Sequence, residues 1–263
     1  MTTILETRFL ERTFGAVYAA RDINITINEG EILGVIGSNG AGKTTFVNMV
    51  TGYLEPSSGE ILYRGKNIVG KPTRDITQMG ICRSFQIPQL FPELAVIDNI
   101  MTALILSRQQ GISLFKSAVS CELKQQARDL LARFKIDAYA DQEISTLPQG
   151  VRKLIDIAMA TVADPDLLFL DEPTSGVSAD EKMDFMQTLI DALKSSRTAV
   201  LFIEHDMEII ETFSPRCVAF YEGTILADGS TNDVLKEPKV REFVIGSEFH
   251  RETSMQQGGQ ASC

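Results

Sequence analysis

The apolar and polar positions of the chain change repeatedly between a strand-like and a helix-like period. Isoleucines alternate with polar residues over 23–27, which is typical of a half-buried antiparallel strand. The runs at 32–36, 167–170 and 199–203 are almost continuously apolar, which is typical of strands that are buried on both faces. These runs predict an α/β core, preceded by short strands and turns within residues 1–30.

Helical periodicity separates the predicted strands. From Leu94 to about Phe134, apolar residues recur at steps of three and four, and few strand signals interrupt them. We interpret residues 88–150 as a helical subdomain inserted into the α/β core. Further helices are predicted over 42–51, 151–162, 181–193 and 207–213, and hairpins over 60–66 and 218–226.

The end of the chain differs from the rest in composition. Residues 247–263 are polar and include the run QQGGQ at 256–260. A segment with so few apolar residues cannot bury a core, so it predicts a flexible tail. Residues 1–246 hold all the predicted strands and helices, and we expect them to form a single domain.

The charge of the chain narrows its possible partners. The 263 residues include 35 acidic and 25 basic side chains, which is a formal net charge of −10. This balance argues against a nucleic-acid-binding protein, whose usual surface is basic, and against attraction to anionic lipid headgroups.

Apolar runs and cysteines indicate the compartment. No apolar stretch approaches the roughly 18 residues that a membrane-spanning helix needs, so a role at a membrane requires a partner protein. The four cysteines form no CxxC pair, which predicts neither a zinc site nor a disulfide framework. A reducing cytosol fits best.

The strongest chemical signal is the run GSNGAGKT at 37–44, which matches the phosphate-binding loop GxxxxGK[ST]. Glycines let backbone N–H groups approach phosphates, Lys43 reaches the β- and γ-phosphates, and Thr44 offers a hydroxyl to Mg²⁺. A chance match is the alternative, but a buried strand precedes the run and a helix follows it. The expected nucleotide-binding residues are Ser38, Asn39, Gly40, Ala41, Gly42, Lys43, Thr44 and Thr45.

A second signal follows the apolar strand at 167–170, where Asp171 and Glu172 come next. Such a strand delivers its final carboxylates to the edge of the sheet where α/β proteins bind ligands. We expect Asp171 to hold Mg²⁺ and Glu172 to polarise the attacking water as a general base. On its own, the pair would be read as an acidic turn; the phosphate loop upstream favours the catalytic interpretation.

Two further polar residues matter by position. Gln86, at the start of the helical insertion, is expected to contact Mg²⁺ or water; without the other motifs it would be read as a solvated loop residue. His205 follows the strand at 199–203 and can donate a hydrogen bond to a γ-phosphate, although a lone histidine is more often a surface or packed residue.

In order and spacing, these motifs resemble an ABC-transporter ATPase subunit, over about residues 4–246. The resemblance is closer to the branched-chain amino-acid uptake subgroup. The segments that carry this are TFG at 13–15, GSNGAGKTT at 37–45, RSFQ at 83–86, IEHDM at 203–207, and ADGS at 227–230 with the residues that follow to Gly246.

The resemblance implies a fold: a P-loop NTPase core with a mixed sheet, an N-terminal antiparallel β-subdomain and an inserted helical subdomain. It also implies that Phe14 stacks on adenine, where the alternative is a core aromatic. The segment LPQGV at 147–151 occupies the position of the family signature, usually LSGGQ, and Gly150 would approach the nucleotide of a second subunit. Pro148 departs from the pattern because it has neither a hydroxyl nor an N–H, which leaves the strength of that second site open.

By resemblance, the chain is expected to be the ATP-hydrolysing subunit of an importer. Its substrate would be ATP with Mg²⁺, and its partners a second ATPase subunit, two membrane permeases and, indirectly, a solute-binding protein. It would lie on the inner face of the cell membrane, held there by the permeases. The alternatives are an ABC ATPase of a lipid exporter, a soluble ABC ATPase without a transport role, and a degenerate, nucleotide-sensing subunit suggested by Pro148.

Overall fold

The computed structural model describes residues 2–84, 90–107, 121–194 and 196–246. Its larger sheet has six strands in the order β10-β9-β3-β8-β7-β6, and β10 alone pairs antiparallel with its neighbour. The sheet is therefore mixed, as expected. Its strands are β3 (Ile32–Gly37), β6 (Ile81–Ser84), β7 (Leu167–Asp171), β8 (Ala199–Ile203), β9 (Arg216–Tyr221) and β10 (Thr224–Ser230).

The smaller sheet is antiparallel, in the order β2-β1-β4-β5. The prediction of short strands within residues 1–30 is wrong, because β1 (Thr3–Phe14) and β2 (Val17–Asn28) each run for 12 residues. Their pairing contains several register shifts, which interrupt the alternation of apolar positions and make one long strand look like several short ones. The predicted hairpin is confirmed in β4 (Ser58–Tyr63) and β5 (Lys66–Asn67).

Both faces of the larger sheet are covered. Along β7, Leu167 and Phe169 belong to a core shared with helix α1 (Lys43–Val50) and the smaller sheet, while Leu168 and Leu170 belong to a core shared with the other helices. The continuous apolar run is thus explained by burial on two sides. Helices α6 (Lys182–Lys194) and α7 (Met207–Phe213) pack on the second face and agree with their predicted ranges.

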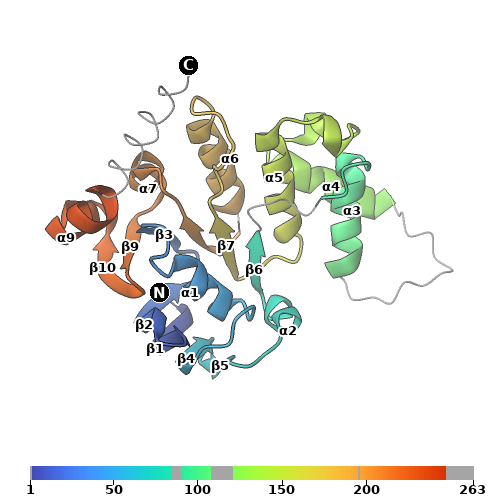
Figure 1. The fold of residues 1–263 in the computed structure, drawn as a ribbon. Coiled ribbons are helices and arrows are strands. Elements are labelled where there is room, and N and C mark those ends of the chain that lie inside the picture. Colours follow the sequence, from blue (N-terminus) through green and yellow to red (C-terminus); the bar gives the residue numbers. More distant parts are fainter. Residues whose placement is uncertain (1, 85–89, 108–120, 195, 247–263) are drawn as a thin grey trace, which may run out of the picture.

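A group of helices stands beside β6, at the side of the molecule away from β10 (Figure 1). The helical pattern predicted from 94 to 134 resolves into two helices, and the residues between them lie outside the described part. The group consists of α3 (Val96–Ser107), α4 (Cys121–Arg133), the 3₁₀ turns η1 (Asp137–Tyr139) and η2 (Ile144–Thr146), and α5 (Gln149–Ala160).

Several short elements have no counterpart in the predicted pattern, because they are too short to show a period. They are α2 (Thr73–Gln78), strand β6, α8 (Thr231–Lys236), α9 (Pro238–Val240) and the π-helix η3 (Arg241–Ile245). Among the described residues, no helix combines the length and apolar character needed to cross a membrane. The predicted tail, 247–263, lies outside the described residues.

Candidate functional site

The loop between β3 and α1 wraps tightly because two of its glycines are packed against other backbone. Gly37 has a φ of +153°, and a Cβ there would lie 2.5 Å from the carbonyl oxygen of Phe220. Gly42 has a φ of +102°, and a Cβ there would lie 2.7 Å from the carbonyl oxygen of Ala19. Only glycine fits these positions, so the loop conformation depends on the residues that the sequence pattern singles out.

Lys43 opens helix α1 and is buried. Its Nζ donates hydrogen bonds to the carbonyls of Gly37 and Ser38, the latter at 3.1 Å. The ammonium group therefore lies inside the curve of the loop, where the phosphates of a nucleotide would lie.

Asp171 ends β7 and forms an ion pair that the sequence did not predict. Nη2 of Arg83, on the neighbouring strand β6, lies 2.7 Å from Oδ2 of Asp171. The other arm of the guanidinium donates to Oδ1 of Asn48 on α1 at 2.6 Å. Arg83 thus connects the end of β7 to the helix that follows the phosphate loop.

Glu172 follows Asp171 with a φ of +47°, which is an uncommon backbone conformation for a residue other than glycine. Its N–H donates to the carbonyl of Ile203 in β8 at 3.0 Å, which holds it next to the end of that strand. Nε2 of His205 lies 3.3 Å from Oε1 of Glu172. The two residues that were predicted to act on water and phosphate are therefore in contact.

The segment after Glu172 is held by two buried charged residues that the sequence analysis did not identify. Lys153 of α5 donates to the carbonyls of Glu172 and Ser175, at 2.6 and 2.8 Å. Glu204 accepts hydrogen bonds from the N–H and the hydroxyl of Thr174, both at 2.8 Å. Lys153 lies among buried residues of its helix, and this charge on an apolar face is the signal that sequence reasoning had available.

Burial shifts the pKa values of these two residues in opposite senses. It lowers the pKa of Lys153 below its ordinary value, although nearby carboxylates, Glu204 first among them, act against this. Burial likewise raises the pKa of Glu204, against the hydrogen bonds from Thr174 and His205 and the charge of Lys153.

One pocket of about 160 Å³ collects most of the predicted residues, and Ala19 and Ile203 complete its lining. The predicted residues in it are Asn39, Gly40, Ala41, Gly42, Lys43, Thr44, Thr45, Asp171, Glu172 and His205. The loop residues 39–45 and residues 171–205, which lie 126 to 166 positions apart in the chain, are thereby brought together, because β3, β7 and β8 are parallel neighbours that end at the same edge.

The pocket contains donors that suit Mg²⁺. Thr44 contributes a hydroxyl and Asp171 a carboxylate, and hard cations such as Mg²⁺ prefer oxygen ligands. The donor set therefore fits the ion, with Arg83 already bound to one oxygen of the carboxylate. Gln86, the third expected ligand, lies outside the described residues.

Phe14 and the signature segment lie apart from this pocket's lining. The Phe14 ring is half exposed at the end of β1, with the Arg12 guanidinium 4.7 Å from its centre. It is therefore not a core aromatic. Pro148 immediately precedes α5, and Gly150 lies in the first turn of that helix.

A sheet that brings a phosphate loop and two carboxylates to one pocket defines the chain as a P-loop nucleoside triphosphatase. The family model described as ABC transporter matches residues 20–175. The chain thus belongs to the ABC transporter family, as the sequence motifs indicated, and it is the ATP-binding, ATP-hydrolysing subunit of such a transporter.

Relatives extend this similarity over nearly the whole chain. A probable branched-chain amino acid transport ATP-binding protein LivG of Archaeoglobus fulgidus is 33% identical over 93% of this chain and 96% of the relative. The high-affinity branched-chain amino acid transport ATP-binding protein LivG of Escherichia coli K12 is 32% identical over 92% of this chain and 98% of the relative. The crystal structure of the ATP-binding cassette MJ1267 in its ADP conformation superposes with a TM-score of 0.81, at 29% identity, over 92% of this chain and 98% of that one.

Proposed function

We propose that this chain drives an importer for branched-chain amino acids or related small amide and carboxylate solutes. The observation that carries the proposal is the pocket that unites Lys43, Asp171, Glu172 and His205, in a chain that matches branched-chain amino acid transport proteins over nearly their full length. Residues 1–246 act as one ABC ATPase domain, with residues 88–150 as its helical subdomain.

The phosphate loop binds the triphosphate of ATP. Its backbone N–H groups and the N-terminus of α1 face the phosphates, and Lys43 turns from its loop carbonyls to the β- and γ-phosphates. Thr44 and Asp171 would hold Mg²⁺, with Gln86 as a further ligand. When bound there, the ion would supply positive charge that neutralises the phosphate oxygens during transfer of the γ-phosphate.

Glu172 and His205 act on the water and on the γ-phosphate. The carboxylate of Glu172 accepts a proton from the attacking water, which makes the oxygen a better nucleophile. His205, which touches this carboxylate, orients it and donates a hydrogen bond to a γ-phosphate oxygen. Phe14 stacks on the adenine with the ring face that Arg12 leaves open.

Two copies of the chain, or this chain and a second ATPase subunit, enclose two ATP molecules. Gly150 and the N-terminus of α5, whose N-cap residue Pro148 makes no side-chain capping hydrogen bond, approach the γ-phosphate of the partner's ATP. Pro148 stands where the usual family signature has a serine, and it has neither a hydroxyl nor an N–H. The backbone of the following turn therefore makes the contact with the partner's γ-phosphate.

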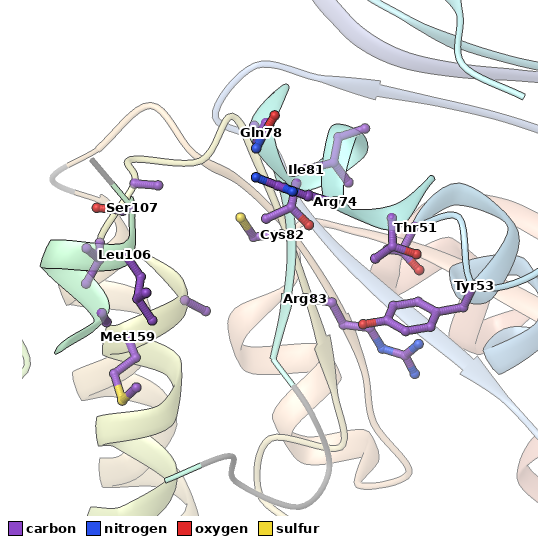
Figure 2. Close-up of a pocket in the computed structure, with 17 residues that line it drawn as sticks. Thr51, Tyr53, Arg74, Gln78, Ile81, Cys82, Arg83, Leu106, Ser107 and Met159 are labelled. Carbon is purple, nitrogen blue, oxygen red and sulfur yellow. The ribbon is translucent and has the colours of Figure 1, made fainter. Parts of the chain in front are cut away.

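The permeases dock in a second, larger pocket of about 770 Å³ (Figure 2), which shares no lining residue with the phosphate-loop pocket. It lies between β6 with its flanking segments, which carry Gln78, Cys82 and Arg83, and the helical group, which carries Leu106 and Met159. Leu106 and Tyr53 line this pocket and are exposed large apolar side chains. A short amphipathic segment of a membrane protein suits this mixture of apolar and polar groups, and the chain thereby lies on the inner face of the membrane.

Reconstitution with the cognate membrane proteins tests this function. The chain is purified with the permeases that bind it and placed in vesicles with the solute-binding protein. We expect ATP-dependent uptake of leucine, isoleucine or valine, and loss of uptake together with ATP binding in Lys43→Ala. ATP hydrolysis that drives lipid movement instead, or co-purification with no membrane protein, would contradict the proposal.

A further inference from the structure

The first two turns of α5 pack directly on the segment 172–177, which begins with the catalytic carboxylate. The side chain of Gln149 lies so close to Gly176 that a Cβ on this glycine would be 2.1 Å from Nε2 of Gln149. A Cβ on Gly150 would lie 3.8 Å from a methyl group of Val177. The helix therefore touches this segment over several residues.

Lys153 makes the strongest of these connections. Its side chain is 4% exposed, and its Nζ donates to the carbonyls of Glu172 and Ser175. A hydrogen bond from a charged donor is stronger than one between neutral groups, and a buried donor cannot exchange its partner for water. The backbone of Glu172 is thereby tied to α5.

Glu204 holds the same segment from the side of β8. It is also 4% exposed and accepts both hydrogen bonds of Thr174. Lys153 thus binds the carbonyls of Glu172 and Ser175, and Glu204 binds the donors of Thr174, which lies between them. Between them they leave the backbone at Glu172, with its positive φ, little freedom to move independently of α5 and β8.

The other end of α5 lies at the larger pocket. Met159 and Ala160 line that pocket, and Met159 follows Lys153 by six residues, which is about 9 Å along a helix. A single rigid helix therefore connects the pocket to the backbone of Glu172.

We propose that Lys153 is a positioning residue that couples the larger pocket to the Glu172 carboxylate through α5. Occupation of the pocket by a permease segment moves α5, and Lys153 carries this movement to the carbonyl of Glu172. The carboxylate then changes its place relative to His205 and the γ-phosphate. The inference rests on the proposed function, since it needs ATP hydrolysis and a partner in the pocket.

The test compares Lys153→Met with Lys153→Arg, and with Lys124→Met as a control on the exposed face of α4. Each full-length variant is studied alone and in complex with the permeases. ATP turnover gives kcat and KM, and the fluorescence of a labelled ATP analogue gives nucleotide affinity. We expect Lys153→Met to lower kcat at least tenfold, with affinity within twofold of wild type, and to abolish the stimulation by permeases. Lys153→Arg recovers most of both, and Lys124→Met behaves as wild type.

The outcomes separate the proposals. Wild-type kcat and stimulation in Lys153→Met would overturn the coupling role. So would a parallel loss of affinity and kcat, because that indicates a general structural defect. If Lys153→Met does not fold, Lys153→Gln replaces it: the side chain is uncharged and one bond shorter, so it cannot reach the carbonyls of both Glu172 and Ser175 as Nζ does. Wild-type kcat and stimulation in Lys153→Gln would therefore also overturn the role. A wild-type complex that hydrolyses no ATP would contradict the proposed function instead.

Discussion

The guanidinium of Arg83 lies 2.7 Å from Oδ2 of Asp171, and both side chains are mostly buried, at 12% and 13% exposure. The ion pair joins β6 to the end of β7. The other arm of the guanidinium donates a hydrogen bond to Asn48 in helix α1, which begins at Lys43. Asp171 is the carboxylate that we expect to hold Mg²⁺. The protein therefore supplies a positive charge of its own to this carboxylate.

Replacement of Arg83 by methionine tests how much Asp171 depends on that charge. A mostly buried carboxylate without a counter-charge is costly, so we expect the nucleotide-free protein to lose about 2 kcal/mol of unfolding free energy. Mg²⁺ with ATP would then stabilise Arg83→Met more than wild type. Urea denaturation with and without Mg·ATP measures both effects.

The control for this prediction is Arg128→Met. Arg128 pairs with Asp141 at 3.8 Å, and both side chains are exposed. Exposed pairs contribute little, so we expect a change below about 0.5 kcal/mol. Equal stability of Arg83→Met and wild type would show that Asp171 needs no counter-charge.

Glu172→Gln separates binding from hydrolysis. The amide has nearly the same shape but cannot accept a proton from water, so we expect ATP turnover to fall by about 10²-fold or more. ATP binding is retained, and ATP holds the ATPase dimer closed. Turnover assays and size-exclusion chromatography with ATP measure the two effects, and unchanged turnover would remove Glu172 from the role of general base.

Glu204→Gln changes the pH dependence of stability. Burial raises the pKa of Glu204 above its ordinary 4.5, so between these two values the native state binds more protons than the unfolded state. The free energy of unfolding of the wild type therefore loses a contribution as pH rises through this interval. Glutamine still accepts the hydrogen bonds of Thr174 but does not ionise.

We therefore expect the stability of Glu204→Gln relative to wild type to increase as pH rises above 4.5, and to become constant above the raised pKa. Urea denaturation at a series of pH values measures this difference. Two curves that stay parallel over the whole range would mean that Glu204 titrates at its ordinary value in the folded protein.

Phe14→Ala tests the adenine contact. Stacking of a base on an aromatic ring is worth about 1–3 kcal/mol, so we expect ATP affinity to fall by about 5- to 150-fold, and Phe14→Tyr to retain it. Tyr18, which is also half exposed and adjoins Ala19 of the nucleotide pocket, is the matched comparison. A loss of affinity in Tyr18→Ala with none in Phe14→Ala would assign the stacking to Tyr18.

The elements that the sequence predicted well are those whose signal is local. The phosphate loop is one continuous segment, and the three apolar runs became β3, β7 and β8 because burial on both faces demands uninterrupted apolar residues. Short elements such as β6 and α2 were not predicted, because four to six residues are too few to show a periodic pattern of apolar positions. Strand length in β1 and β2 was underestimated because register shifts disturb the alternation.

The sequence alone therefore determined the class of protein, the phosphate loop and the two carboxylates after a buried strand. Only the tertiary structure decided which charges meet them. Arg83 and Asp171 are 88 residues apart, and their contact follows from the parallel pairing of β6 with β7. Lys153 reaches Glu172 because α5 packs on the segment after β7. Such contacts depend on strand order and helix placement, which global packing sets and no local pattern of residues encodes.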